Sequence, residues 1–362
     1  MNAGPLASQL SLEEKLAQLV FVRIGSNLPP IVGASDDESR VLALLSQCPV
    51  GGLLLFNAAW PEVAESLERL QNASQIPLLI AADLERGAGQ QIKGLTVFPH
   101  AMAFKNQGGQ TAELVARTTA ATASEALAAG VHILFAPVAD ASTNPNNPII
   151  ATRAYAEDPH QAATLVAAAV QGIESAGGLS TAKHFPGHGD TSQDSHAELP
   201  MVAKSGEELR STELVPFKAA IEAGVSLMMT AHVSYPGLDP TGAPATFSRV
   251  IIEEVLRGEL GFQGVVCSDS LLMEGAKAGF DSEGAMAAAA LAAGVDLLLD
   301  LTDPAAAVKR LAEEVDRGAL SIERVDEAVA RVLTLKSRIG NHSPRFGQAV
   351  GQETLEDSRR LA

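Results

Sequence analysis

Residues 179–196 read LSTAKHFPGHGDTSQDSH, an apolar run followed by a polar, glycine-rich segment. The run is typical of a buried strand that ends near Phe185, because Pro186 and the glycines after it break regular structure. The segment contains one Lys, three His and two Asp. Catalytic groups concentrate on loops that a rigid scaffold positions. We therefore predict a strand that delivers an ordered, catalytic loop.

Similar apolar runs recur along the chain and alternate with segments of helical pattern. The predicted strands are 19–24, 50–56, 76–82, 131–137, 179–185, 227–233, 264–268 and 295–300. The predicted helices are 11–19, 38–47, 62–73, 111–129, 159–176, 205–223, 248–260, 282–293, 304–317 and 322–339. This order predicts an α/β fold of the (β/α)8 TIM-barrel type in a single domain.

The alternative is a doubly wound sheet. It is disfavoured because no Gly-x-Gly-x-x-Gly follows the first strand and no phosphate-binding P-loop occurs. Polar residues instead follow several different strands, as in barrel enzymes. We predict a catalytic barrel over residues 1–340 and a C-terminal surface extension over 341–362.

Composition limits the function further. The formal charge of −17 over 362 residues disfavours non-specific binding to nucleic acid or to an anionic membrane surface. The first residues lack the pattern of a signal peptide, and no apolar run is long enough to span a membrane. We expect a cytoplasmic monomer.

The two cysteines, Cys48 and Cys267, are too far apart in the sequence to form the Cys-x-x-Cys spacing of a metal site. Cys267 is predicted to be a buried apolar residue.

Two carboxylates follow apolar runs and are candidates for chemistry. Asp83 comes after 78–82 and Asp269 after 265–267. At the mouth of a barrel such a pair suits covalent glycoside chemistry or the binding of sugar hydroxyls. The alternative for Asp269 is a helix N-cap before Leu271.

The three His and two Asp of the polar segment also raise the possibility of a metal site. Lys183 directly precedes His184, and a cation there disfavours a divalent metal; we expect neither metal nor cofactor. Asp194 and His196 are alternate residues of an extended segment and project to the same side. An Asp beside an imidazole fixes its tautomer and raises its basicity.

Arg153 and His232 allow two interpretations each. Arg153 follows an Asn- and Pro-rich loop and is either a substrate clamp or a loop-stabilising ion pair. His232 follows the sixth strand and is either a pocket residue or a packed core histidine.

Taken together, these segments resemble glycoside hydrolase family 3, in particular its β-N-acetylhexosaminidase branch. The polar segment from Lys183 through His196 resembles the signature loop of that family. Residues 135–140 with 144–153 look like its fourth-strand region, and 260–276 look like its nucleophile region. The resemblance extends from about residue 11 to residue 339.

The resemblance implies a role for each matching residue. Asp269 would be the nucleophile, His196 the general acid/base, and Asp194 the residue that orients His196. Substrate binding is expected from Asp83, Arg153, Lys183, His184 and His232, the first four as contacts to sugar hydroxyls. Family β-glucosidases that take a Glu acid/base from a second domain are longer, which favours the His–Asp branch here.

One segment departs from the family pattern. After Asp83 the hexosaminidases usually read Gln-Glu-Gly-Gly-Arg, whereas this chain has Leu-Glu-Arg-Gly-Ala. The Arg that usually follows near position 91 is Gln91 here, so that sugar contact is in doubt.

The predicted function is therefore that of a retaining exo-β-N-acetylglucosaminidase. It would act on cell-wall (muropeptide) or chitin fragments, as in peptidoglycan recycling, with a small carbohydrate as its binding partner. The alternatives are a β-N-acetylglucosaminide phosphorylase or a β-glucosidase of the same family, and a non-catalytic sugar-binding homologue. A neutral imidazole repels an anionic acceptor less than a carboxylate does, so phosphate in place of water stays open.

Overall fold

The computed structural model describes residues 9–105, 108–191, 199–277, 279–339 and 352–362 of the chain. Within them, eight parallel strands form a closed barrel in the order β1-β10-β9-β8-β7-β6-β4-β2. The strands are β1 (Val20–Ile24), β2 (Gly52–Leu55), β4 (Leu79–Ala82), β6 (Ile133–Leu134), β7 (Leu179–Phe185), β8 (Leu227–Thr230), β9 (Val265–Ser270) and β10 (Leu297–Leu299). The predicted (β/α)8 barrel is confirmed, and each predicted strand overlaps one barrel strand; β9 extends two residues beyond the predicted end at 268.

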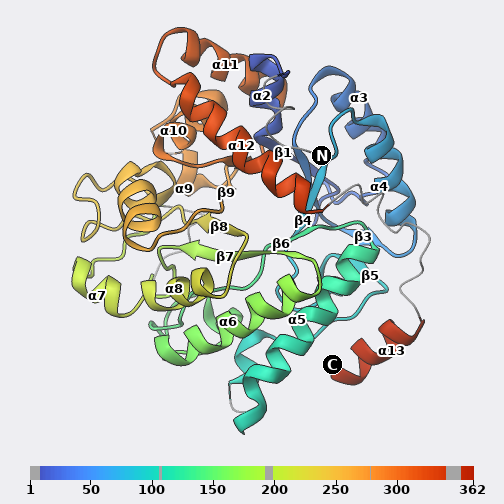
Figure 1. The fold of residues 1–362 in the computed structure, drawn as a ribbon, viewed down its shortest axis with the longest axis vertical. Helices are drawn as coiled ribbons and strands as arrows, with labels where there is room; N and C mark the ends of the chain where they lie inside the picture. The colour runs from blue at the N-terminus through green and yellow to red at the C-terminus, as the bar shows by residue number, and fades with distance from the viewer. Residues whose placement is uncertain (1–8, 106–107, 192–198, 278, 340–351) are drawn as a thin grey trace.

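Helices surround the barrel and connect its strands (Figure 1). They are α2 (Leu12–Gln18), α3 (Glu38–Gln47), α4 (Glu62–Ala73), α5 (Thr111–Ala128), α6 (Pro159–Ser175), α7 (Gly206–Ser211), α8 (Leu214–Glu222), the π-helix η6 (Val250–Glu259), α9 (Glu274–Lys277), α10 (Glu283–Ala293), α11 (Pro304–Asp316), α12 (Ile322–Arg338) and α13 (Gln352–Leu361). The short 3₁₀ turns are η1 (Ala88–Gln90), η2 (Ala101–Phe104), η3 (Gly108–Gln110), η4 (Ala151–Arg153) and η5 (Ala245–Phe247).

Local sequence explains where several helices begin. Ser11 and Ser205 each form a capping box with the Glu three residues later. These boxes pair backbone N–H groups that a helix start would leave without partners. α6 and α11 begin with Pro at the first turn, after an aspartate cap.

One predicted helix, 205–223, is wrong as a continuous element. It divides into α7 and α8, with Thr212 and Glu213 between them. The break lets the buried Glu213 side chain accept a hydrogen bond from Lys204 Nζ at 2.5 Å. A tertiary partner therefore overrides the helical pattern.

The small sheet β3 (Ala58–Ala59) with β5 (Ile92–Lys93) was not predicted. Its two-residue strands are too short for a sequence pattern. The helix α13 was not predicted either; it packs against α5 (Figure 1). Residues 340–351 lie outside the described ones, and the boundary at residue 340 stays a prediction.

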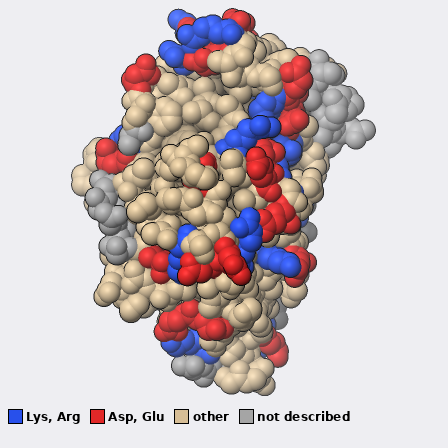
Figure 2. Space-filling model, turned by 90° about the vertical axis from the view of Figure 1, so that its left-hand side faces the viewer, with Lys and Arg blue, Asp and Glu red and all other residues tan. Residues whose placement is uncertain are grey.

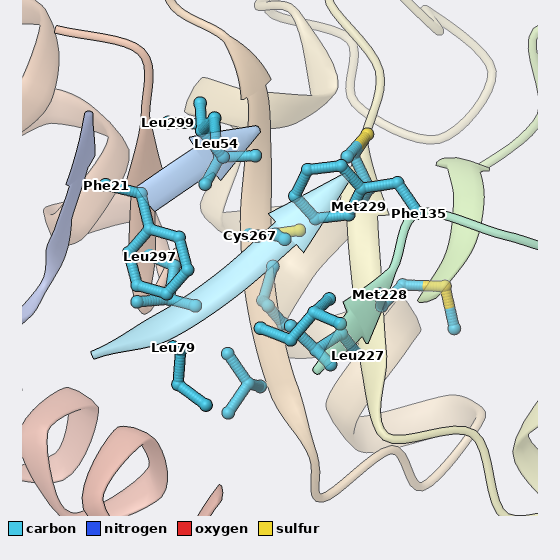
Figure 3. Close-up of a cluster of buried hydrophobic side chains, with 14 of the residues drawn as sticks. Phe21, Leu54, Leu79, Phe135, Leu227, Met228, Met229, Cys267, Leu297 and Leu299 are labelled. Atoms are coloured by element: carbon cyan, nitrogen blue, oxygen red, sulfur yellow. The ribbon is translucent and has the colours of Figure 1, made fainter. Parts of the chain in front are cut away.

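Apolar side chains from the strands fill the barrel (Figure 3). Phe21, Leu79, Met229 and Cys267 lie in this cluster, each at most 3% exposed. Cys267 is buried as predicted, and burial raises the pKa of its thiol. Because the interior is packed, a ligand site belongs at the ends of the strands.

Among the described residues, no helix combines the length and apolarity needed to cross a membrane.

On the face shown in Figure 2, Lys and Arg side chains are interspersed with Asp and Glu.

Candidate active site

A cavity of about 430 Å³ opens among loops that follow the C-terminal ends of the strands. It is lined by Asp83, Glu85, Arg86, Gln90, Gln91, His100, Ala101, Ile149, Arg153, Lys183, His184, His188 and Asp269. Five of the predicted site residues are thus brought together from four segments of the chain: Asp83, Arg153, Lys183, His184 and Asp269.

Lys183 and His184 both line the cavity although they are neighbours in β7. Side chains alternate between the two faces of a regular strand, so neighbours normally diverge. Here the pairing of β7 with β8 shifts register between Lys183 and Phe185. Such an irregularity re-aims side chains and is common beside active sites.

A network of ion pairs forms one wall. Lys183 Nζ lies 2.7 Å from Asp83 Oδ1 and 2.7 Å from Glu85 Oε1. Arg153 donates to both Glu85 oxygens, from Nε at 2.9 Å and from Nη2 at 2.7 Å. Burial acts to raise the pKa of Glu85, but the charges of Lys183 and Arg153 outweigh it and hold that pKa well below its usual range. Glu85 is therefore ionised and fixes both cations.

Arg153 was open to two interpretations, a substrate clamp or an ion pair. The structure places it in an ion pair with Glu85 and also in the lining of the cavity. Its planar guanidinium has five donors, and the carboxylate of Glu85 takes only part of them.

Asp269 lies in β9 and its side chain is 23% exposed. Its Oδ1 accepts a hydrogen bond from Ser270 N at 2.7 Å, and its Oδ2 lies 4.0 Å from His184 Nε2. Burial acts to raise the pKa of Asp269, but His184, His232, the Ser270 N–H and Lys183 together lower it. The group is thus a partly exposed, ionised carboxylate, as a nucleophile requires. The next helix, α9, begins only at Glu274, so the N-cap alternative is not what the structure has.

Asp140 holds the two histidines of the cavity in place. Its Oδ2 accepts from His184 Nδ1 at 2.8 Å and from His184 N at 3.1 Å. Its Oδ1 accepts from His188 N at 2.6 Å. Because Asp140 accepts the hydrogen bond from Nδ1, the His184 ring is oriented with its Nε2 toward Asp269.

His188 is 2% exposed, and its Nδ1 lies 2.9 Å from Thr191 Oγ1. Burial and the neighbouring His184 lower the pKa of His188 to about 4. The ring is therefore a neutral imidazole at neutral pH, with both donor and acceptor capacity.

The loop after β7 is fixed to its surroundings. Tyr235 donates from its hydroxyl to Gly187 O at 2.7 Å, and Asn147 donates to His188 O at 2.8 Å. Gly187 has φ of 137°, and a Cβ there would meet Glu213 Cβ at 2.6 Å, so this position requires glycine.

His232 lies behind the wall of the cavity rather than in its lining. It is 1% exposed, stacked on Phe247 with ring centroids 6.3 Å apart, and its Nε2 lies 3.1 Å from Ser270 O. The position favours the packed interpretation, in which His232 supports Asp269 and lowers its pKa.

Asp194 and His196 lie outside the described residues, so their roles stay predictions. Among the residues that the structure does describe, no group of three His, Cys, Asp or Glu is arranged to hold a metal ion.

Sequence reasoning missed Glu85, Asp140 and His188 as site residues. Glu85 lies two residues after Asp83, and His188 lies within the polar segment, so proximity to predicted residues was an available signal. Asp140 follows the predicted strand 131–137 in the region that resembles the family's fourth strand, so its position was also a signal, but its contact with His184 joins positions 44 residues apart and is not visible in the sequence.

Comparisons with known proteins identify the family of the chain. The model of the glycosyl hydrolase family 3 N terminal domain matches residues 11–335. A beta-hexosaminidase of Tolumonas auensis is 39% identical over 279 residues, which cover 75% of this chain and 81% of that protein.

Two solved structures are similar to the whole chain. A glycoside hydrolase family 3 beta-N-acetylglucosaminidase from a Paenibacillus species has a TM-score of 0.86 and 37% identity, covering 97% of this chain and 68% of that one. A beta-glucoside phosphorylase has a TM-score of 0.87 and 28% identity, covering 99% of this chain and 65% of that one.

Proposed function

Since this chain belongs to glycoside hydrolase family 3, we propose that it is a retaining exo-β-N-acetylglucosaminidase. Its substrates are fragments of cell wall or chitin with a terminal β-linked N-acetylglucosamine. The observation that carries the proposal is the ionised, partly exposed Asp269 in a cavity whose other charged and polar groups suit sugar hydroxyls. The similar beta-hexosaminidases and beta-N-acetylglucosaminidase support the choice of sugar.

In the first step, an Asp269 oxygen attacks the anomeric carbon and the bond to the leaving oxygen breaks. His196 gives its proton to that oxygen, with Asp194 stabilising the charged imidazole. In the second step, His196 takes a proton from water, the water oxygen attacks the anomeric carbon, and the ester to Asp269 breaks. Two inversions retain the β configuration.

The ion-pair network supplies the binding of the sugar. Asp83, Lys183 and Arg153 present charged donors and acceptors to its hydroxyls, and His184 presents an imidazole nitrogen; charged hydrogen bonds are stronger than neutral ones. Glu85 and Asp140 act through them as positioning residues. Prior fixing of these groups reduces the reorganisation needed when charge develops at the anomeric carbon.

The test is release of aryl alcohol from matched β-N-acetylglucosaminide and β-glucoside by the wild-type protein and by Asp269→Asn. Turnover of the acetamido sugar that is lost in Asp269→Asn supports the sugar and the nucleophile. Asp316→Asn, which removes the same charge from an exposed position on α11, is the matched control. Activity that survives in Asp269→Asn contradicts the mechanism, and an inverted anomer in the first product contradicts retention.

A second candidate is a phosphorylase or a β-glucosidase, favoured by the similarity to the beta-glucoside phosphorylase. Formation of a sugar 1-phosphate upon addition of phosphate distinguishes the phosphorylase. Faster turnover of the β-glucoside than of the acetamido sugar distinguishes the glucosidase.

A further inference from the structure

Arg86 lines the cavity together with Gln90, Gln91 and His100. Its backbone is fixed on both sides: Arg86 N donates to Gln90 Oε1 at 3.1 Å, and Arg86 O accepts from Phe98 N at 2.8 Å. The side chain is therefore presented from a fixed backbone beside Asp83 and Glu85, at a position where the family pattern described above has glycine.

Arg86 differs from the other two cations of the cavity. Lys183 is paired with Asp83 and Glu85, and Arg153 holds Glu85 with two hydrogen bonds. Among the described residues, Arg86 has neither an ion pair nor a side-chain hydrogen bond to another residue. Its guanidinium keeps five N–H donors for a ligand, in the fork that matches a carboxylate or a phosphate.

The charge of the cavity changes during the proposed reaction. Its described lining holds three carboxylates (Asp83, Glu85 and Asp269) and three cations (Arg86, Arg153 and Lys183), a formal sum of zero without histidines. Ester formation neutralises Asp269 and leaves a formal charge of +1. Charges interact strongly in a partly enclosed cavity, so Arg86, which has no ion-pair partner among the described residues, then favours an anionic acceptor.

We propose that Arg86 is an oxyanion-binding site for the group adjacent to the sugar, in either the leaving group or the acceptor. The proposal rests on the glycosyl transfer to Asp269 proposed above. Two sources supply this chemistry: a carboxylate on an acidic sugar next to the cleaved bond, and free phosphate as acceptor. In the second case a phosphate oxygen bonds to the anomeric carbon, the bond from that carbon to Asp269 breaks, and its electron pair returns to the carboxylate.

The first arm of the test compares two disaccharides, N-acetylglucosaminyl-β-1,4-N-acetylglucosamine and the same compound with a 3-O-lactyl carboxylate on its reducing sugar. The ratio of their kcat/KM values is measured for wild type, Arg86→Gln and Arg86→Lys. Loss of a charged hydrogen-bond pair lowers the preference for the acidic compound about 10–100-fold in Arg86→Gln. Arg86→Lys restores part of it. Lys93→Ala, which removes an exposed charge on β5 outside the cavity lining, is the control and leaves the ratio as in wild type.

The second arm follows sugar 1-phosphate formed from an aryl β-N-acetylglucosaminide with inorganic phosphate, at matched ionic strength. If phosphate is the oxyanion that Arg86 binds, the wild-type protein should form the sugar 1-phosphate and the Arg86→Gln variant should not. If neither the ratio nor phosphate transfer depends on Arg86 while the hexosaminides are still cleaved, this proposal is wrong and the proposed function stands. If the wild-type protein cleaves none of the hexosaminides, both the proposed function and the proposed role of Arg86 are wrong.

Discussion

Two clusters of ion pairs lie at opposite ends of the barrel. At the C-terminal ends of β4 and β7, Lys183 forms ion pairs with Asp83 and Glu85, and Arg153 forms one with Glu85, at the wall of the cavity. Before the N-terminal end of β10, one fully buried carboxylate, Asp296, accepts from three guanidiniums.

The second cluster is closed. Asp296 Oδ2 lies 2.8 Å from Arg257 Nη2 and accepts from Val266 N at 3.0 Å, while Oδ1 lies 2.5 Å from Arg324 Nη2 and 3.1 Å from Arg331 Nη1. η6, α12 and β9 are tied together through this one side chain. Its acceptor capacity is directed to protein groups, whereas the first cluster borders open space. Ion pairs thus connect elements of the fold at one end of the barrel, and at the other end they line the cavity in which we propose that the sugar binds.

The largest expected effect is a loss of catalytic activity without a loss of stability, upon substitution of Asp269 at the cavity. Asp269→Asn is expected to lower kcat about 10⁴-fold or more, because the amide cannot form the glycosyl ester. Urea unfolding of the same variant is expected to match wild type within about 1 kcal/mol. A fall in stability comparable to that of an Asp296 variant would contradict the assignment of Asp269 to chemistry.

The complementary change is at the closed end. Asp296→Ala leaves three partly buried guanidiniums without their shared, fully buried carboxylate and is expected to cost about 3–5 kcal/mol in the free energy of unfolding. The kcat of the folded protein is expected to remain within about 2-fold of wild type, because cavity and cluster lie at opposite ends and are independent. Urea unfolding and active-site titration measure the two quantities, with Asp316→Ala as surface control. A specific loss of kcat would show that the two ends are coupled.

Glu85→Gln tests whether the open cluster also positions substrate groups. Loss of the shared carboxylate removes the ion pair of Arg153 and one of the two ion pairs of Lys183, and displacement of these groups by about 1 Å is expected to lower kcat/KM about 100-fold. Glu85 also gives a pH signature. Since its folded pKa lies below its unfolded value, its stabilisation is present above about pH 4.5 and is lost as the pH falls below that value. The unfolding free energy of the variant should therefore fall less steeply in this acid range, and identical slopes would argue against the ion pairs.

The smallest effect concerns His188. Its pKa of about 4 lies below the ordinary value of 6.5, so the unfolded chain binds more protons between these pH values. The contribution of neutral His188 to the free energy of unfolding is fully present above pH 6.5. About 2–3 kcal/mol of it is lost as the pH falls toward 4. His188→Asn should remove this slope from a series of urea unfolding curves. An unchanged slope would assign the pH dependence to other groups.

The strands and most helices follow from local pattern. The helices α3 and α4 have the predicted bounds, because their apolar periodicity and flanking residues agree. The helix predicted over 205–223 failed because Glu213 has a partner outside it. The short strands β3 and β5 exist through their mutual pairing alone.

The sequence by itself determined the barrel and the residue types of the candidate site, since a period of apolar runs and a polar loop are local properties of the chain. Only the tertiary structure decided how those residues are paired. Glu85 meets Arg153 across 68 positions, and Asp140 meets His184 across 44. Whether a charge is matched or available to a ligand depends on such long-range neighbours. For this reason Arg153 is paired with Glu85, while Arg86 has no ion-pair partner among the described residues. Burial likewise placed His232 behind Asp269 and kept His188 neutral, because desolvation is a property of the folded packing and not of the local sequence.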